Sequence, residues 1–139
     1  MVERLLIVAA IALLVVVLIA GGRALARRRL SELREADPGR LWAGLGAEPD
    51  GRPTVVAFST PSCGACRTAQ EPALTALQAK LGDGLRVIHV DAADRPEVAS
   101  TFGVLTVPAT VVLDRRGRVA VANQGFATAD QLALQLQLA

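Results

Sequence analysis

Residues 58–67 read Phe-Ser-Thr-Pro-Ser-Cys-Gly-Ala-Cys-Arg and carry both cysteines of the chain, Cys63 and Cys66. The run from Thr54 to Ser59 is apolar and β-branched, which is typical of a strand buried on both faces. From Gly64 to about Leu81 apolar residues recur at helical spacing, so the sequence predicts a helix that begins at the cysteines. Ligand sites in open α/β sheets lie at the carboxyl ends of the strands. The cysteine pair is therefore the first candidate site.

The cysteine count limits the chemistry that this pair can support. A small secreted domain held together by disulfides carries more than two cysteines. A structural Zn²⁺ site needs four ligands, whereas the chain offers two cysteines and a single histidine, His89. We therefore expect no metal site within one chain; a soft metal or cluster bridged between two chains stays as an alternative. What remains is a lone Cys-x-x-Cys, either a redox pair or a buried structural pair, and its spacing alone needs support from the elements around it.

The elements after the cysteines predict a mixed sheet. We expect a strand at 85–91, a short helix at 96–102 closed by Gly103, strands at 109–113 and 118–122, and a helix at 131–138 capped by Thr128. The short segment 114–117 makes the last two strands an antiparallel hairpin. The helix after the cysteines makes the first two strands a right-handed parallel crossover. The expected fold class is α/β, with a mixed four-stranded sheet flanked by helices.

A short helix is expected before the first strand. Asp37 is a good N-cap and Pro38 a good first helical residue, which predicts a helix at about 39–46. This helix contains Trp42, the one tryptophan of the chain, which we expect to be a packing anchor. A turn-forming cluster of Pro, Asp and Gly at 49–53 separates the helix from the strand.

Together these features resemble the thioredoxin family over about residues 54–138. The resemblance rests on residues 58–67, on residues 90–98 and 117–119, and on residues 102–110 with their Val-Pro-Ala-Thr segment. Neither the cysteine pair nor that segment alone is specific for the family. The two motifs together, placed in this order of strands, are specific for it. The resemblance implies a thioredoxin-like fold in which Pro108 is cis and faces the cysteines. It also implies that the backbone of Val107 pairs with an extended substrate chain.

The resemblance further implies a redox-active disulfide between Cys63 and Cys66. Only a thiolate attacks a disulfide, and the free N–H groups and dipole at a helix start favour that anion. Cys63 is therefore expected to be the exposed nucleophile, and Cys66, one turn further in, resolves the mixed disulfide. The expected function is a thiol–disulfide oxidoreductase that reduces or exchanges protein disulfides. It needs no cofactor, and its partners are protein disulfides and an electron donor that the sequence does not identify.

The sequence departs from the family pattern near the cysteines. Ser62 stands where Trp is usual, and Ala65 replaces the Pro between the cysteines. Ala57 replaces a buried acid that helps to deprotonate the resolving cysteine. The helix proline, Pro72, comes six residues after the second cysteine instead of five, which implies a shifted kink. Strongly oxidising relatives often carry His at the position of Ala65, so its absence favours a reductant or an exchange catalyst.

His89 is the one titratable group that the sequence provides as a substitute for the acid that Ala57 replaces. It aligns with the strand position where many thioredoxins carry a Lys near that acid. A lone histidine on a strand also fits a purely structural role. His89 is therefore a candidate acid–base group, with the structural role as its alternative.

The N-terminal part of the chain has the composition of a membrane span. Residues 5–22 contain no charged or strongly polar side chain, and a helix of this length spans roughly 27 Å, close to the thickness of a bilayer core. We expect three parts: a transmembrane anchor at 1–22 that contacts the lipid bilayer, a basic juxtamembrane helix or stalk at 23–37, and a thioredoxin-like domain at 38–139.

The charges that flank residues 5–22 predict the orientation of the span. Four arginines follow it closely, whereas Glu3 and Arg4 precede it; the four are Arg23, Arg27, Arg28 and Arg29. The positive-inside rule then places the N-terminus outside and the folded domain in the cytoplasm. A signal peptide cleaved near 24–26 is the rival, but its charge would precede a shorter apolar stretch. We therefore expect an uncleaved anchor.

Charge and aromatic content argue against a nucleic-acid-binding protein. The chain has a formal net charge of +2, with its basic excess in the first 40 residues, and it contains three Phe, one Trp and no Tyr. The folded part thus lacks both a basic surface and stacking side chains. Two further alternatives stay open. One is an extracytoplasmic enzyme that maintains thiols of secreted or haem-bearing proteins, and the other is a non-catalytic interaction module with a thioredoxin fold.

Overall fold

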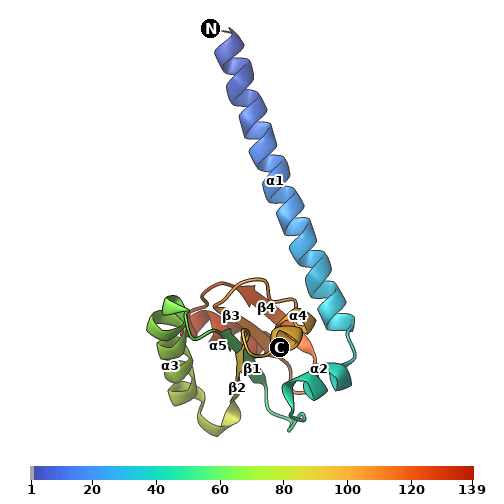
Figure 1. The fold of residues 1–139 in the computed structure, drawn as a ribbon, viewed down its shortest axis with the longest axis vertical. Helices are drawn as coiled ribbons and strands as arrows, with labels where there is room; N and C mark the ends of the chain where they lie inside the picture. The colour runs from blue at the N-terminus through green and yellow to red at the C-terminus, as the bar shows by residue number, and fades with distance from the viewer. Residues whose placement is uncertain (1) are drawn as a thin grey trace. The chain divides into compact units, whose positions relative to one another are not determined.

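We describe residues 2–139 from a computed structural model. The chain forms two units, residues 1–32 and residues 33–139. The second unit contains a four-stranded sheet in the order β2-β1-β3-β4 (Figure 1). Its strands are β1 (Thr54–Ser59), β2 (Arg86–Asp91), β3 (Ala109–Leu113) and β4 (Val119–Gln124). β1 pairs parallel with β2 and antiparallel with β3, and β3 pairs antiparallel with β4. The predicted crossover and hairpin are confirmed.

Helices cover both faces of the sheet (Figure 1). α3 (Glu71–Leu81) and α5 (Ala129–Leu138) pack on one face, where Val55 and Ala57 of β1 meet Leu74, Leu77 and Leu132. α2 (Pro38–Leu45) and α4 (Pro96–Thr101) contact each other. Because side chains alternate along a strand, Phe58 faces the opposite side from Ala57. There its ring packs against Phe102, which follows α4, with 5.6 Å between the ring centroids.

β2 lies at one edge of the sheet. The sequence predicts a buried strand at 85–91, but only Leu85 and Val90 are buried, and Arg86–Ile88 are half-buried. An edge strand has one neighbour and is covered less completely than a central strand. Apolar content alone does not reveal that position, because it depends on the order of the strands.

α2 begins and ends as its sequence predicts. The Asp37 carboxylate accepts a hydrogen bond from the Gly39 N–H, and Gly46 closes the helix at φ +69°. Trp42 is 2% exposed, and its indole Nε1–H donates to the Gly117 carbonyl at 2.9 Å. A Cβ on Gly117 would lie 2.5 Å from the Trp42 Nε1. Trp42 therefore anchors α2 to the β3–β4 turn, and the anchor requires glycine there.

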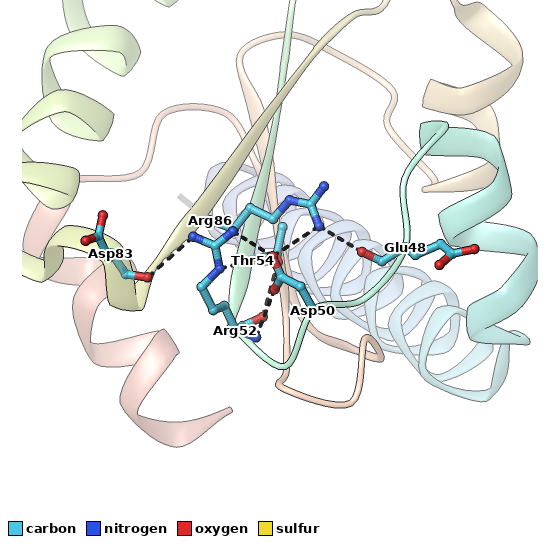
Figure 2. A network of polar contacts seen from close by, with 6 residues as sticks. All are labelled: Glu48, Asp50, Arg52, Thr54, Asp83 and Arg86. Carbon is cyan, nitrogen blue, oxygen red and sulfur yellow. Dashed lines mark hydrogen bonds and ion pairs between the residues drawn. The ribbon is translucent and has the colours of Figure 1, made fainter.

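Charged side chains fix the start of the sheet, at the end opposite Ser59. The Asp50 carboxylate accepts hydrogen bonds from the Arg52 side chain at 2.6 and 3.0 Å and lies 3.4 Å from the Arg86 guanidinium (Figure 2). Arg86 also donates to the Glu48 carbonyl, and Arg52 donates to the Asp83 carbonyl. Hydrogen bonds from Arg52 lower the pKa of Asp50 from its usual value near 3.8. The network joins the segment before β1 to β2.

The helix that follows the cysteines contains one turn that the sequence does not predict. Residues Cys66–Gln70 form a π-helical turn, and α3 follows directly from Glu71. The Glu71 N–H donates to the Cys66 carbonyl, five residues earlier, so this turn holds one residue more than an α-helical turn. Compared with the family spacing, Pro72 comes one residue late. The π turn accommodates this extra residue.

Residues 2–32 of the first unit belong to α1, an α-helix at Val2–Glu35 with no buried residue. It is long and apolar enough to cross a membrane, by length and composition. The helix is continuous through residues 23–35, as the sequence predicts for the segment after the apolar run.

Candidate active site

The two cysteines form a disulfide just after the carboxyl end of β1. The sulfur atoms are 2.08 Å apart and the Cα atoms 5.3 Å apart. Cys63 is half-buried, whereas Cys66 is 5% exposed and begins the π turn. A turn at 60–63, closed by the Cys63 N–H to the Thr60 carbonyl at 3.1 Å, leads the chain from the strand into the helix. Cys63 is thus the more exposed residue of the pair.

The backbone around Cys63 favours negative charge on its sulfur. The N–H of Cys66 donates to Cys63 Sγ at 3.1 Å. This donor belongs to the first turn of a helix, where N–H groups have no helical partner and the dipole is positive. The neighbouring Arg67 guanidinium donates to the Pro61 carbonyl and holds the turn before Cys63. The Cys66 N–H is therefore already in position to donate a hydrogen bond to a thiolate at Cys63.

The proline segment lies at the same end of the sheet. The peptide bond between Val107 and Pro108 is cis, and Pro108 is buried. Ala109 pairs with Phe58 across β1 and β3, so the residues just before β3 lie beside the end of β1. Within residues 2–139 the Val107 N–H and carbonyl have no hydrogen-bond partner. A free backbone N–H and carbonyl at a sheet end can pair with an added extended chain.

The structure places His89 on the edge strand, across from Ala57. Its side chain is 50% exposed, and its Nδ1 lies 3.7 Å from Oε2 of Glu71. Glu71 is the residue whose N–H closes the π turn onto the Cys66 carbonyl. His89 is therefore connected to the turn of the second cysteine through Glu71.

Gln70 is a site residue that the sequence does not single out. Its side chain is buried, with the residue 3% exposed, and its amide makes two hydrogen bonds with the backbone of Ala127. Oε1 accepts from the Ala127 N–H at 3.2 Å, and Nε2 donates to the Ala127 carbonyl at 3.3 Å. Gly125 donates to the Pro108 carbonyl at 2.9 Å. Residues 125–127 therefore connect the proline segment with the π turn.

Among residues 2–139 no group of three or more His, Cys, Asp or Glu side chains lies together in a way that could hold a metal ion.

The fold and the site together define a class of protein, and the comparison with known families agrees with it. The model of the thioredoxin family matches residues 48–137, which is well over half of the chain. The chain therefore belongs to the thioredoxin family.

Curated thioredoxins are similar to this chain over half of its length or more. Thioredoxin of Bacillus subtilis (strain 168) is 33% identical over 69 residues, which cover 50% of this chain and 64% of the relative. Thioredoxin of Alicyclobacillus acidocaldarius is 31% identical over 85 residues, which cover 61% of this chain and 79% of the relative. The chain thus spans just under two thirds of the first of these relatives and more of the second.

Solved structures show the same fold. The thioredoxin of Fasciola hepatica matches with a TM-score of 0.55 at 25% identity, over 63% of this chain and 81% of that one. Thioredoxin-2 of a malaria parasite matches with a TM-score of 0.58 at 20% identity, over 63% of this chain and 84% of that one.

Proposed function

We propose that this chain is a thiol–disulfide oxidoreductase whose reactive group is Cys63. The observation that carries the proposal is the disulfide after β1, with the Cys66 N–H 3.1 Å from Cys63 Sγ. That donor and the greater exposure of Cys63 support its role as nucleophile. The low exposure of Cys66 supports its role as the resolving group. Membership of the thioredoxin family supports the same chemistry.

The exchange proceeds in two steps, formation of a mixed disulfide and its resolution. The Cys63 thiolate attacks one sulfur of a partner disulfide, an intermolecular disulfide forms, and the partner's other sulfur leaves as a thiolate. Cys66, once deprotonated, then attacks Cys63 Sγ and releases the second partner thiolate. The partner gains two electrons, and both of its thiolates take up protons. The chain ends with the disulfide between Cys63 and Cys66, and a dithiol reductant returns it to the reduced state.

Val107 and Pro108 are proposed to bind the substrate. The unpaired backbone of Val107 lies beside the end of β1 and can hydrogen-bond an extended polypeptide that carries the disulfide. The substrate class is therefore a protein disulfide in an extended segment.

We further propose that residues 1–22 anchor the domain to a membrane, with residues 23–37 as a basic juxtamembrane helix and residues 38–139 as the catalytic domain. The support is the length and composition of α1 and its arginines after residue 22. By the positive-inside rule the catalytic domain then lies in the cytoplasm. A reporter active only outside the cytoplasm, fused after Ala139, should stay inactive. High activity would place the domain outside, as a thiol-maintenance enzyme for secreted or haem-bearing proteins.

The activity is tested with the full chain in detergent micelles. The reduced chain should alkylate faster at Cys63 than at Cys66, as read by mass spectrometry. The Cys66→Ser variant should accumulate a covalent complex with a disulfide-bearing protein, and Cys63→Ser should form none. Equal alkylation of the two sulfurs together with absence of a trapped complex would contradict the mechanism. Such a result would leave the chain as a non-catalytic interaction module.

A further inference from the structure

The helix α1 carries a group of arginines directly after its apolar run. The group consists of Arg23, Arg27, Arg28 and Arg29, and all four side chains are exposed. Residues 33–139 carry eleven acidic and ten basic side chains, so the basic excess of the chain belongs to this group. Dense positive charge beside a candidate membrane span is a surface for a negatively charged partner.

Within residues 2–139 no side chain neutralises these arginines. Glu32 follows Arg28 by four residues and Arg29 by three, and both spacings allow an ion pair on a helix. Neither ion pair forms, and none of the four guanidinium groups donates a hydrogen bond to another described residue. Ser31 donates only to the backbone carbonyl of Arg28. The guanidinium groups are therefore available to a partner outside the chain.

The rise of the helix places three of the arginines at the depth of lipid headgroups. We call Arg27, Arg28 and Arg29 the arginine triplet. Gly22 ends the apolar run, and the triplet follows it at roughly 7.5 to 10.5 Å along the helix axis. The headgroup layer on each side of a bilayer core is about 5 to 7.5 Å thick. Helical side chains point back toward the N-terminus, here toward the apolar run, so the long arginine side chains reach that layer.

We propose that the arginine triplet is a binding surface for anionic phospholipids, which rests on the membrane anchoring proposed above. Successive helical residues are about 100° apart, so the triplet covers about 200° of the circumference and each guanidinium faces a different lipid. The planar guanidinium forms two parallel hydrogen bonds with a phosphate. A zwitterionic headgroup offers the same phosphate but adds a cation that repels arginine. The triplet therefore prefers lipids with a net negative charge.

The test uses the full chain in micelles of an uncharged detergent with equal amounts of phosphatidylglycerol, which is anionic, and phosphatidylcholine, which is zwitterionic. Native mass spectrometry measures how much of the chain carries each lipid. The unsubstituted chain should bind about 10-fold more phosphatidylglycerol than phosphatidylcholine, because each arginine near an anionic surface strengthens the attraction. The combined variant Arg27→Gln, Arg28→Gln, Arg29→Gln should lower this preference to about 2-fold or less.

Two control variants separate a local surface from an effect of net charge. The combined variant Arg40→Gln, Arg115→Gln, Arg116→Gln removes three exposed arginines of the folded unit and should keep the full preference. Lysine at all three positions of the triplet keeps the charge and should keep most of the preference. An equal loss in the folded-unit variant, or a complete loss in the lysine variant, would overturn the proposal.

A carbonate wash of vesicles that contain the unsubstituted chain separates this proposal from the anchor on which it rests. The chain should stay with the vesicles, as a membrane-spanning helix does. A retained chain without a preference for phosphatidylglycerol would overturn the lipid surface while the anchor stands. Release of the chain into the wash would overturn the anchor, and the lipid surface with it. Disulfide reduction by Cys63 and Cys66 is measured separately and depends on neither outcome.

Discussion

Gln70 and Ala127 are 57 residues apart in the chain and share two buried hydrogen bonds. A glutamine amide offers one acceptor and one pair of donors, which matches the N–H and carbonyl of a single residue. Since Ala127 is fully buried, water cannot replace these bonds. The side chain of Gln70 thus forms with Ala127 the two hydrogen bonds that the backbone of a neighbouring strand would form within a sheet. The pairing holds the loop after β4 against the turn that carries Cys66.

Substituting Gln70 by Leu should lower the free energy of unfolding by about 3 kcal/mol, because two buried backbone groups lose their partners. Guanidinium unfolding of the full chain in micelles, followed by the fluorescence of the single tryptophan, measures the change. Gln78→Leu is the matched control, since Gln78 is exposed on α3 and its change should be within about 0.5 kcal/mol. Equal midpoints for the two variants would show that the hydrogen bonds of Gln70 do not stabilise the fold.

His89→Ala tests whether the edge-strand histidine takes part in proton transfer. If it exchanges protons with Cys66 through Glu71, its loss should slow disulfide reduction about 10-fold and change the shape of the pH–rate profile. The measurement is the rate of peptide disulfide reduction between about pH 5.5 and about pH 9 at fixed substrate. Glu71→Gln should have the same effect on the profile. A profile identical to that of the unsubstituted chain would leave His89 with a structural role.

At the scale of elements, the π turn decides how the redox end joins the core. α3 packs Leu74 and Leu77 against the sheet, and the cysteines must sit at its start with their sulfurs bonded. Relative to the family spacing, the chain has one additional residue between the cysteines and α3. This residue lies within Cys66–Gln70, so the cysteines and the core side chains of α3 both keep their contacts. The π turn thus lets the cysteines keep their position without rotating Leu74 and Leu77 away from the core.

Deleting Thr68, an exposed residue of the π turn, should therefore be tolerated. The turn becomes α-helical while the residues on either side keep their positions, and the free energy of unfolding should change by about 1 kcal/mol or less. Deleting Ala76 in α3 is the control, because it rotates Leu77 by about 100° relative to Leu74. Leu77 would leave the core, with an expected loss above about 3 kcal/mol. Tryptophan fluorescence against guanidinium concentration compares them, and similar losses would contradict the role of the π turn.

The charged network before β1 gives the stability a dependence on pH. The pKa of Asp50 is lowered in the folded chain, chiefly by the side-chain hydrogen bonds of Arg52, so the unfolded chain binds this proton more readily. The stabilisation is present above the usual value near 3.8 and is lost as the pH falls through the lowered pKa. In Asp50→Asn the decline of the unfolding midpoint between about pH 5 and pH 3 should be shallower. The exposed Asp94→Asn variant is the control, and an identical decline in both variants would contradict the prediction.

At the scale of the whole molecule, the two units are stabilised in different ways. Residues 33–139 enclose a core between a sheet and its helices, whereas α1 has no buried residue. A helix without packing partners in water is marginal and frays, unless a bilayer or micelle covers its apolar part. We therefore expect the exposed basic segment after the apolar run to open more readily than the folded unit.

Brief digestion with trypsin in micelles should first cut between Arg23 and Arg29. The resulting fragment should contain the whole sheet, because Arg52 and Arg86 are held in the network before β1. Intact mass measurement of the fragments identifies the sites. First cuts between Arg52 and Arg118 would show that the folded unit opens more readily than the segment after the apolar run. The boundaries proposed for the three parts of the chain would then need revision.

Patterns within short stretches of sequence predict most of this fold. The features that they do not predict depend on contacts between residues that are distant in the sequence. The strand at Thr54–Ser59 and the cap of α2 follow from adjacent residues, and both are confirmed. The half-buried state of β2 depends on the order of the strands, which no local pattern contains. The place of Gln70 depends on hydrogen bonds between segments that are distant in the sequence. Near the cysteines, sequence thus predicts the candidate residues, while the contacts that hold their turn against the loop after β4 are seen only in the folded chain.

The π turn also affects how this chain should be aligned with its relatives. Since the additional residue belongs to Cys66–Gln70, the gap in the shorter sequences should be placed there, before Pro72. An alignment that moves this gap into α3 would assign core positions to neighbouring exposed residues. A template-based structure built on that alignment would turn the intervening part of α3 by about 100° and bury its polar side chains. Residue-by-residue transfer of roles from other thioredoxins is sound only after the gap is placed correctly.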